Sequence, residues 1–283
     1  MAGQEEAADR LLPLGAEPQP AHPRIVNAAG PADQAQAFES LGLAGHRRRV
    51  DAQPFFACSS PFTRGSPLAN SAHTFFVKAI DAPGNESTVR SRTFTVDTVP
   101  PAVPQITATT PASPANNNSP KVKGSAAAGS TVKLYRIAGC TGTAVASGSA
   151  TQFSSPGLSA TVTDNTTTTF RATATDAAGN TSACSSPRTY VEDSTVPQTS
   201  ITAGPSGPTT DSTPTYNFSS SEPNSTFQCR FDSQAFAACS GPGASHTPST
   251  TLPAGSHTFE VRATDKAKNT DATPSKRTFT VAP

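Results

Sequence analysis

A segment that recurs three times constrains the fold of this 283-residue chain more than any other feature. The copies align without gaps at residues 73–85, 168–180 and 257–269. Their aspartates, at positions 81, 176 and 265, lie 95 and then 89 residues apart. That period is about the length of one small β-sandwich domain, so the sequence predicts a tandem array.

Each copy has the pattern of a β-strand that runs into a turn. In the third copy Phe259, Val261 and Ala263 alternate with polar residues. Because successive side chains of a strand point to opposite faces, we expect the apolar set to face a core and the polar set to face water. A second strand-like segment follows every copy, at residues 92–96, 188–191 and 277–281. The sequence therefore predicts one hairpin in each period.

An aspartate and an asparagine flank the connection in every copy. The pairs are Asp81 with Asn85, Asp176 with Asn180, and Asp265 with Asn269. Both side chains bond readily to nearby backbone groups, so we interpret these residues as turn formers. Calcium is the alternative, but it takes six to eight oxygen ligands and one such pair offers too few. We therefore expect no metal and no cofactor.

Proline-containing linkers follow the second strand of the first two copies, at residues 97–101 and 193–197. Proline fixes φ and cannot donate to a ladder, so these linkers predict domain boundaries. We expect an incomplete repeat at 46–98 and complete domains at 99–194 and 195–283. Residues 1–45 lack the repeat pattern, and we expect them to form a disordered or irregular leader.

Longer stretches of the chain resemble a known family. Residues 198–281 are similar to the bacterial immunoglobulin-like repeats of large secreted and surface proteins, especially those of actinobacteria, through stretches such as Ser206–Pro214 and Gly255–Ala263. Residues 111–193 resemble a sister type through Asn118–Gly124 and Gly129–Tyr135. The resemblance implies all-β, Greek-key sandwiches, secretion, and a spacer or adhesive role. It implies no catalytic residue.

The five cysteines suggest two disulfides. A turn around Gln234 is expected to place Cys229 opposite Cys239 on neighbouring strands, at a separation suited to a disulfide. Cys140 and Cys184 are the two cysteines of the predicted middle domain, so we expect them to pair. Two such bonds indicate an oxidising compartment.

Cys58 is then left as a free thiol. Aligning the first and third copies places Cys58 on Cys239, and it places Arg48 where Cys229 stands. We interpret Cys58 as the remnant of a lost disulfide rather than as a nucleophile, since nothing nearby indicates a base to activate it.

Composition and motifs argue against several functions. The formal net charge is +1, so no strong field attracts nucleic acid, and no apolar run is long enough to insert into a membrane. The sequence lacks the common hydrolase, metalloprotease and nucleotide-binding motifs, so we expect no enzymatic activity. The acidic start, Met1–Arg10, lacks the apolar run of a signal peptide, and both ends suggest a piece of a longer secreted chain.

These observations lead to two functional hypotheses. The first is an extracellular structural or adhesive repeat region that acts as a spacer or stalk at a bacterial cell surface. Its partners would be neighbouring repeats of a longer parent and a surface protein or glycan. The alternative is the accessory, carbohydrate-binding region of a secreted hydrolase whose catalytic domain lies outside this chain.

Overall fold

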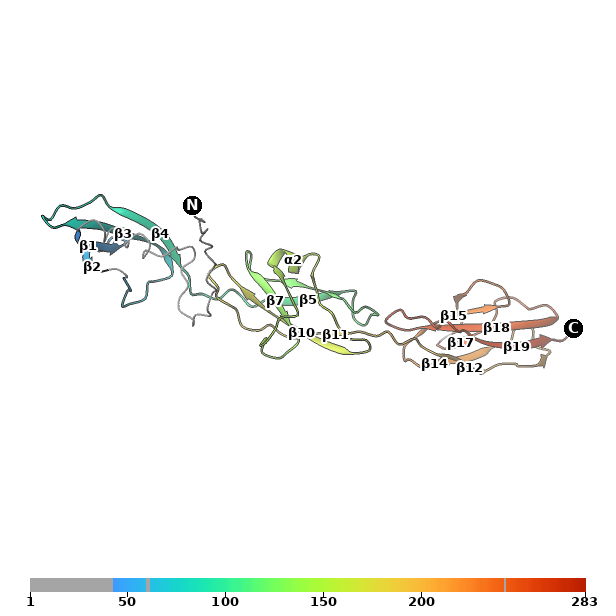
Figure 1. The fold of residues 1–283 in the computed structure, drawn as a ribbon. Helices are drawn as coiled ribbons and strands as arrows, with labels where there is room; N and C mark the ends of the chain where they lie inside the picture. The colour runs from blue at the N-terminus through green and yellow to red at the C-terminus, as the bar shows by residue number, and fades with distance from the viewer. Residues whose placement is uncertain (1–42, 60–61, 242) are drawn as a thin grey trace, which may run out of the picture. The chain divides into compact units, whose positions relative to one another are not determined.

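The structure is a computed structural model, and it describes residues 43–59, 62–241 and 243–283. Most of the predicted leader therefore lies outside the described residues. The described chain forms five β-sheets and one short helix (Figure 1). It divides into two compact units: the described residues up to Val99 together with Ala177–Asn180, and Pro100–Asp176 together with Thr181–Pro283.

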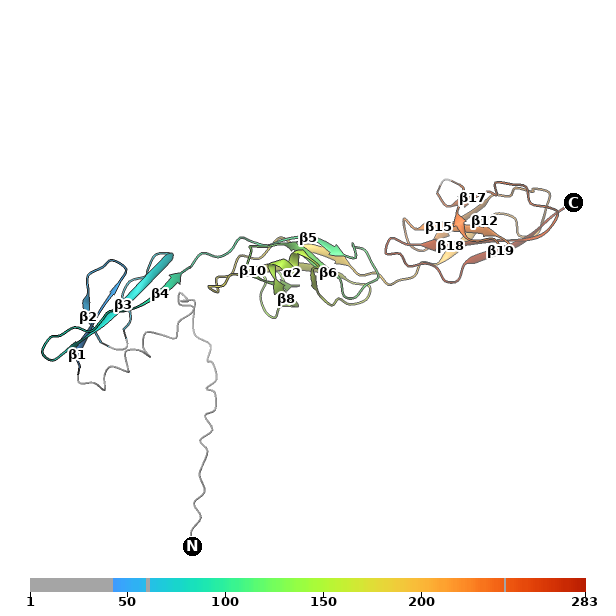
Figure 2. The same cartoon turned by 90° about the horizontal axis from the view of Figure 1, so that it is seen from above.

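The first repeat is a single antiparallel sheet in the order β2-β1-β3-β4 (Figure 2). Its strands are β1 (Leu43–Val50), β2 (Phe56–Cys58), β3 (Ser71–Asp81) and β4 (Arg90–Val96). The predicted hairpin is present, since β3 pairs with β4 from Ser71↔Val96 to Val77↔Arg90. Within the described residues the repeat has no second sheet facing this one.

The middle repeat has two sheets, in the orders β5-β6-β9 and β11-β10-β7-β8. The elements are β5 (Gln105–Thr110), β6 (Lys121–Ser125), β7 (Thr131–Tyr135), β8 (Ala146–Ser149), α2 (Ala150–Ser154), β9 (Leu158–Ser159), β10 (Thr167–Thr175) and β11 (Arg188–Val191). The helix α2 begins with a capping box in which Ser149 and Gln152 bond to each other's backbone N–H groups.

The core of the middle repeat lies between its two sheets. Alternation on β6, β7 and β10 directs Val122, Leu134 and Phe170 inward, and each is 0% exposed. The helix adds Phe153 to the same cluster. Tyr190 is also fully buried, and its hydroxyl donates to the carbonyl oxygen of Asn117 at 2.9 Å. The buried phenol thus keeps a hydrogen-bond partner.

The C-terminal repeat also has two sheets, in the orders β12-β14-β17 and β13-β19-β18-β15-β16. The strands are β12 (Thr199–Ala203), β13 (Pro208–Thr209), β14 (Tyr216–Ser220), β15 (Thr226–Phe231), β16 (Ala237–Ala238), β17 (Ser245–His246), β18 (Gly255–Thr264) and β19 (Ser275–Val281).

The order of the strands gives the C-terminal repeat immunoglobulin-like Greek-key topology. The chain changes sheets on either side of β13, between β14 and β15, and on either side of β17. The short strand β13 pairs in parallel with β19, through Pro208↔Thr280 and Thr209↔Val281. The middle repeat has the same arrangement in shorter form, with a parallel bridge from Ala115 to Glu192. The predicted fold class, tandem immunoglobulin-like sandwiches, is confirmed.

The inward residues expected from alternation on β18 are buried. Phe259, Val261 and Ala263 are each 0% exposed. Tyr216, from the opposite sheet, stacks on Phe259 with the ring centroids 4.2 Å apart. Burial of a large apolar side chain contributes about 1.5–3 kcal/mol, so this stack is a principal contact between the sheets.

One part of the sequence-based register is wrong. We expected Cys229 to lie opposite Cys239, but β15 pairs Cys229 with Ala237. The turn begins earlier than expected, with the Gln234 N–H donating to the Phe231 carbonyl oxygen. Asp232 leaves the ladder in a left-handed conformation, with φ 54°. The strand β16 ends at Ala238, and Cys239 then returns toward Cys229.

No helix within the described residues is both long enough and apolar enough to span a bilayer.

A substitution at Gly124 on β6 measures how closely the core of the middle repeat is packed. A Cβ at this position would overlap the Gln105 carbonyl oxygen and the Phe153 ring. We expect Gly124→Ala to lower the free energy of unfolding by about 1–3 kcal/mol because the core must shift to accept the methyl group. Urea unfolding followed by NMR amide signals of the middle repeat measures this change. Gly207→Ala, with no atom within 4 Å of its Cβ, is the control and should leave those signals unchanged.

Candidate functional site

The Asp–Asn pair closes the turn after the long strand of the first and C-terminal repeats by the same four hydrogen bonds. In the C-terminal repeat the Asp265 N–H donates to the Asn269 carbonyl oxygen, and the Lys268 N–H donates to that of Asp265. The Asp265 carboxylate accepts from the Asn269 backbone at 2.9 Å and from its Nδ2 at 2.8 Å. Asp81 and Asn85 repeat all four bonds. This geometry is what the turn-former interpretation requires.

The bonds in the first repeat also affect ionisation. The hydrogen bond from the Asn85 side chain is the main cause of a lowered pKa of Asp81; burial opposes it, and backbone hydrogen bonds within this turn add smaller effects in the lowering direction. The residue before each asparagine has positive φ: Gly84, Gly179 and Lys268, at 96°, 91° and 77°. Glycine adopts this conformation freely, whereas Lys268 adopts it at a steric cost.

The asparagines of the second and third copies have an additional role that sequence reasoning missed. Asn269 Nδ2 donates to the Asp193 carbonyl oxygen at 2.8 Å, and Asn180 Nδ2 donates to the Asp97 carbonyl oxygen at 3.0 Å. Asp97 and Asp193 occupy the same position, three residues after the aromatic residues Phe94 and Tyr190. That shared spacing is the signal in the sequence that marks the two aspartates as equivalent positions.

The linker aspartates also fold their own segments in the same way. The Asp97 carboxylate accepts from the Val99 N–H at 3.0 Å, and the Asp193 carboxylate accepts from the Thr195 N–H at 3.2 Å. These are Asx turns, which fix the chain direction just before the prolines.

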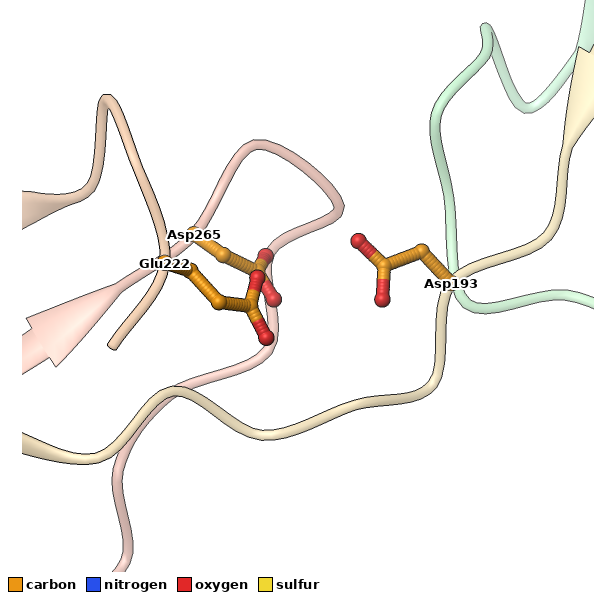
Figure 3. A group of neighbouring side chains, drawn as sticks. All are labelled: Asp193, Glu222 and Asp265. Carbon is orange, nitrogen blue, oxygen red and sulfur yellow. The ribbon is translucent and has the colours of Figure 1, made fainter. Parts of the chain in front are cut away.

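The linker and two turns bring three carboxylates together in the second unit. Asp193, Glu222 and Asp265 each place a carboxylate oxygen within 4.8 Å of the others. Figure 3 shows the three groups facing one another, with Asp193 on the linker, Glu222 after β14 and Asp265 after β18. Burial, and then the charges of Asp193 and Asp265, raise the pKa of Glu222. Its Oε1 is buried and has no hydrogen-bond partner in the described part of the chain.

Among the residues that the structure describes, these three are the group that could hold a metal ion. Carboxylate oxygens suit a hard cation such as Ca²⁺, although three carboxylates supply fewer oxygens than its usual six to eight. Asp265 already accepts two hydrogen bonds from Asn269. Of these three residues only Asp265 belongs to an Asp–Asn pair for which calcium was the alternative, and no local pattern marks Glu222. Glu222 lies after β14 and approaches Asp265, which lies after β18, only in the folded structure.

A second repeated site pairs a histidine with an aspartate. In the C-terminal repeat His257 Nδ1 lies 2.8 Å from Asp232 Oδ2, and His257 Nε2 lies 2.9 Å from the Pro253 carbonyl oxygen. Asp232 Oδ1 also accepts from the Thr258 N–H. Both ring nitrogens therefore face acceptors, and an imidazolium satisfies both.

The first repeat contains the same arrangement. His73 Nδ1 lies 2.7 Å from Asp51 Oδ2, and its Nε2 lies 2.8 Å from the Ala69 carbonyl oxygen. Asp51 also has positive φ, at 55°. Hydrogen bonds to Ala69 and Asp51 raise the pKa of His73. The pair thus fixes a left-handed turn at the same place in both repeats.

Ser71 gives this site the outline of a catalytic triad, because its Oγ lies 3.0 Å from His73 Nε2. The arrangement nevertheless cannot perform the proton transfer of a triad. Nε2 faces the Ala69 carbonyl oxygen at 2.8 Å, an acceptor that only an N–H can satisfy, and hydrogen bonds to Ala69 and Asp51 raise the pKa of His73. A general base needs a free lone pair at Nε2, so His73 cannot take a proton from the serine.

The structure contains two disulfides, Cys140–Cys184 and Cys229–Cys239, with Cα–Cα distances of 5.6 and 5.1 Å. These are the pairs expected from the sequence. Cys58 is the free cysteine of the described residues and is partly buried. Burial raises the pKa of its thiol, against a smaller opposing effect of the Arg48 charge. A raised pKa disfavours the reactive thiolate.

Comparisons with known proteins give structural likenesses only. No protein-family model and no curated protein matches the chain. Similar solved structures include the fibronectin(III)-like modules of Clostridium thermocellum CbhA, at 17% identity over 58% of this chain and 83% of that chain, TM-score 0.36.

Two further structures are similar. The FN1–FN3 domains of chicken CNTN1 match at 11% identity over 86% of this chain and 90% of theirs, TM-score 0.39. The tetra-tandem repeat in the extending region of a large adhesion protein matches at 17% identity over 84% of this chain and 67% of that one, TM-score 0.25. With scores this low we base the fold class on strand topology.

The His257–Asp232 pair predicts a pH-dependent stability. Hydrogen bonds that the ring donates to Asp232 and then to Pro253 raise the pKa of His257 above its usual 6.5. Its stabilisation is therefore complete below about pH 6.5 and is lost as the pH rises through the raised folded-state pKa. We expect the stability difference between wild type and His257→Gln, from urea unfolding of the C-terminal repeat, to shrink over that range.

His246 in the same repeat contributes a pH dependence of stability in the opposite direction, because burial lowers the pKa of His246. Its contribution is present above about pH 6.5 and is lost as the pH falls through the lowered pKa. Subtracting the His257→Gln curve from the wild-type curve removes this background. A difference that grew with rising pH would contradict the imidazolium assignment.

Arg48→Cys should restore a disulfide in the first repeat. Arg48 pairs with Phe56 as Cys229 pairs with Ala237, so Cys58 stands where Cys239 does. We expect no free thiol in denatured, unreduced Arg48→Cys, against one in the wild type. On the chain-entropy model the bond stabilises the sheet by about 3 kcal/mol. Arg47→Cys faces the other side of the strand and should show two thiols. Two thiols in Arg48→Cys would contradict the match between the repeats.

Proposed function

We propose that this chain is a non-catalytic, extracellular repeat region that serves as a spacer or adhesive stalk at a bacterial cell surface. The observation that carries the proposal is the joint between the middle and C-terminal repeats, formed by Asn116, Asp193 and Asn269. A spacer can hold its two ends apart only if consecutive repeats do not bend freely at their joints. Contacts that hold consecutive repeats together are therefore the feature it needs most.

Asn269 is the centre of the joint. It is 8% exposed. Its Nδ2 donates to the Asp193 carbonyl oxygen at 2.8 Å, and its Oδ1 accepts from Asn116 Nδ2 at 2.7 Å. One side chain thus connects the turn of the C-terminal repeat, the linker and a loop of the middle repeat. Each such hydrogen bond contributes about 1 kcal/mol, and burial increases the cost of leaving one unmade.

The linker limits bending in a second way. Pro197 fixes one backbone dihedral, and the Asp193 side chain holds the Thr195 N–H. A short linker with few accessible conformations loses little entropy when the joint forms. The His–Asp sites and the Asp–Asn turns likewise have structural explanations, which supports a role without catalysis.

Disulfides support the extracellular location. Cys140–Cys184 and Cys229–Cys239 each lie within one complete sandwich. Such bonds persist in oxidising surroundings and are rare in the reducing cytosol.

The joint is tested by NMR relaxation on the full chain. We expect the middle and C-terminal repeats of the wild type to tumble as one body. Asn116→Ala removes one donor from an exposed loop residue, so it should increase the population of opened joints about fivefold and shorten the apparent correlation time of the C-terminal repeat.

Asn85→Ala is the matched control, because Asn85 makes the same turn bonds with Asp81 in the first repeat. It should leave the correlation times of the other two repeats unchanged. Independent tumbling of the two repeats in the wild type would contradict the spacer proposal. Tight and selective binding on a glycan array would instead favour the accessory region of a secreted hydrolase.

A further inference from the structure

His246 on β17 is part of the packing of the C-terminal sandwich. Its ring lies against two aromatic rings of the opposite sheet, with centroids 5.6 Å from Phe231 and 5.8 Å from Phe259. Rings at such distances attract one another by about 0.5–1.5 kcal/mol beyond the contribution of the area that they bury. The side chain that packs β17 against the core is therefore one that can change its charge near neutral pH.

The hydrogen bond of this ring requires its neutral form. His246 Nδ1 accepts from the Ser240 backbone N–H at 2.9 Å. A backbone N–H can only donate, so Nδ1 must keep its lone pair, and the hydrogen of the neutral ring lies on Nε2. A proton on Nδ1 removes the acceptor of the Ser240 N–H and places a charge beside the apolar rings, where an unpaired charge is unfavourable.

The ionisable groups on the strands that face His246 are neutral or already paired. Tyr216 lies opposite His246 where β14 pairs with β17, and burial raises the pKa of Tyr216 to about 12, so its phenol is neutral at physiological pH. On the inner face of β18, His257 is bonded to Asp232. These groups therefore supply no free negative charge to an imidazolium at position 246.

The other charged residues of β15 and β18 are also engaged. Arg230 binds Glu260 at 2.8 Å, and Arg262 binds Gln228 at 2.7 Å. Strand alternation places these side chains on the outer face of the sheet, opposite to the face of Phe259. Protonation of His246 therefore adds a charge that its surroundings in the closed structure do not neutralise.

Few main-chain contacts hold the β17 segment, residues 243–248. Strand β17 is the edge of the sheet β12-β14-β17, and it pairs with β14 over two residues. The Phe218 N–H donates to the Ala244 carbonyl oxygen at 3.0 Å. Ser240 Oγ accepts from the Thr247 N–H at 3.1 Å and donates to its carbonyl oxygen at 2.7 Å. The segment can therefore leave without breaking the ladder between β12 and β14.

The chain on both sides of the segment is fixed independently of His246. Before it, Cys239 is joined to Cys229 by a disulfide. After it, the Leu252 N–H donates to the Ser212 carbonyl oxygen at 2.9 Å, and Leu252 packs against the core cluster. Opening is thus confined to a short loop with fixed ends, and local opening of this kind leaves the rest of a domain folded.

We propose that His246 is an acid-sensitive switch whose protonation releases the β17 segment from the sandwich and frees the adjacent edge of β14. The freed edge presents the Phe218 N–H and neighbouring backbone groups without their partners, and such an edge can pair with an added strand. The switch lies within the C-terminal repeat and does not depend on the spacer role.

The direction and size of the effect follow from proton linkage. Burial lowers the pKa of His246 in the closed structure, whereas in the open segment it returns to its usual 6.5. The open form therefore binds the proton more tightly, and acid favours it. As the pH falls from 6.5 to the lowered pKa, the equilibrium constant for opening rises about tenfold per pH unit, and below the lowered pKa it levels off.

Amide hydrogen exchange of the full chain, measured by NMR from about pH 7.5 to about pH 5, tests the proposal. Protection factors remove the intrinsic pH dependence of exchange. Those of Phe218 and Thr247 should fall about tenfold per pH unit below pH 6.5. The fully buried Val261 on the central strand β18 should stay better protected. Equal opening constants for Phe218 and Val261 would mean unfolding of the whole repeat and would overturn the proposal.

Two histidine variants assign the effect. His246→Gln removes the titrating group, so the protection factor of Phe218 should become independent of pH over this range. His257→Gln is the matched control in the same repeat, and it should keep the pH dependence of the wild type. A pH dependence that persists in His246→Gln, or that disappears in His257→Gln, would contradict the assignment to His246.

The wild type alone decides the question if His246→Gln fails to fold. The NMR signals of the His246 ring should titrate with a midpoint below 6.5, and the protection of Phe218 should fall as the pH approaches that midpoint from above. Constant protection of Phe218 while the ring titrates would overturn the proposal, because protonation would then leave the segment in place.

Discussion

The hydrogen-bonded turn between Asp and Asn is the constraint on which the first and C-terminal repeats depend. By closing the end of the long strand it sets the register of the hairpin, and register decides which face is buried, because a slip of one residue would turn every side chain over. With the turn of the C-terminal repeat closed at Asp265 and Asn269, Phe259 and Val261 face the core. The same asparagine then holds the linker, so one turn organises both a sandwich and a joint.

Local patterns made the hairpins and cores predictable. Alternation around Phe259 and the Asp–Asn spacing both act over a few residues, and the structure follows both. The register of Cys229 was not predictable in this way, since the conformation of Asp232 is fixed by His257 and Thr258, which lie 25 and 26 residues further along the chain. Contacts at that separation leave no periodic signal in a single sequence.

The carboxylate cluster and Glu192 are further features that local sequence patterns could not predict, because contacts between distant residues determine them. Glu192 occupies the position of Val96 and Val281, where alternation predicts an apolar residue, yet it is 1% exposed. One carboxylate oxygen accepts from the Asn165 N–H at 2.6 Å, and the other has no partner among the described residues. A hydrogen bond to a loop amide thus replaces apolar packing, a substitution that only the three-dimensional arrangement reveals.

The first repeat separates what a sheet needs to form from what a sandwich needs to be complete. Its four strands keep the register, the His73–Asp51 pair and the Asp81–Asn85 turn of a complete repeat, all of which are contacts within one sheet or its turns. Within the described residues it has no second layer, whose contribution in the other two repeats is mainly apolar burial. Hydrogen bonds within the sheet and its turns thus specify the sheet, whereas apolar burial between two sheets completes the sandwiches of the other two repeats.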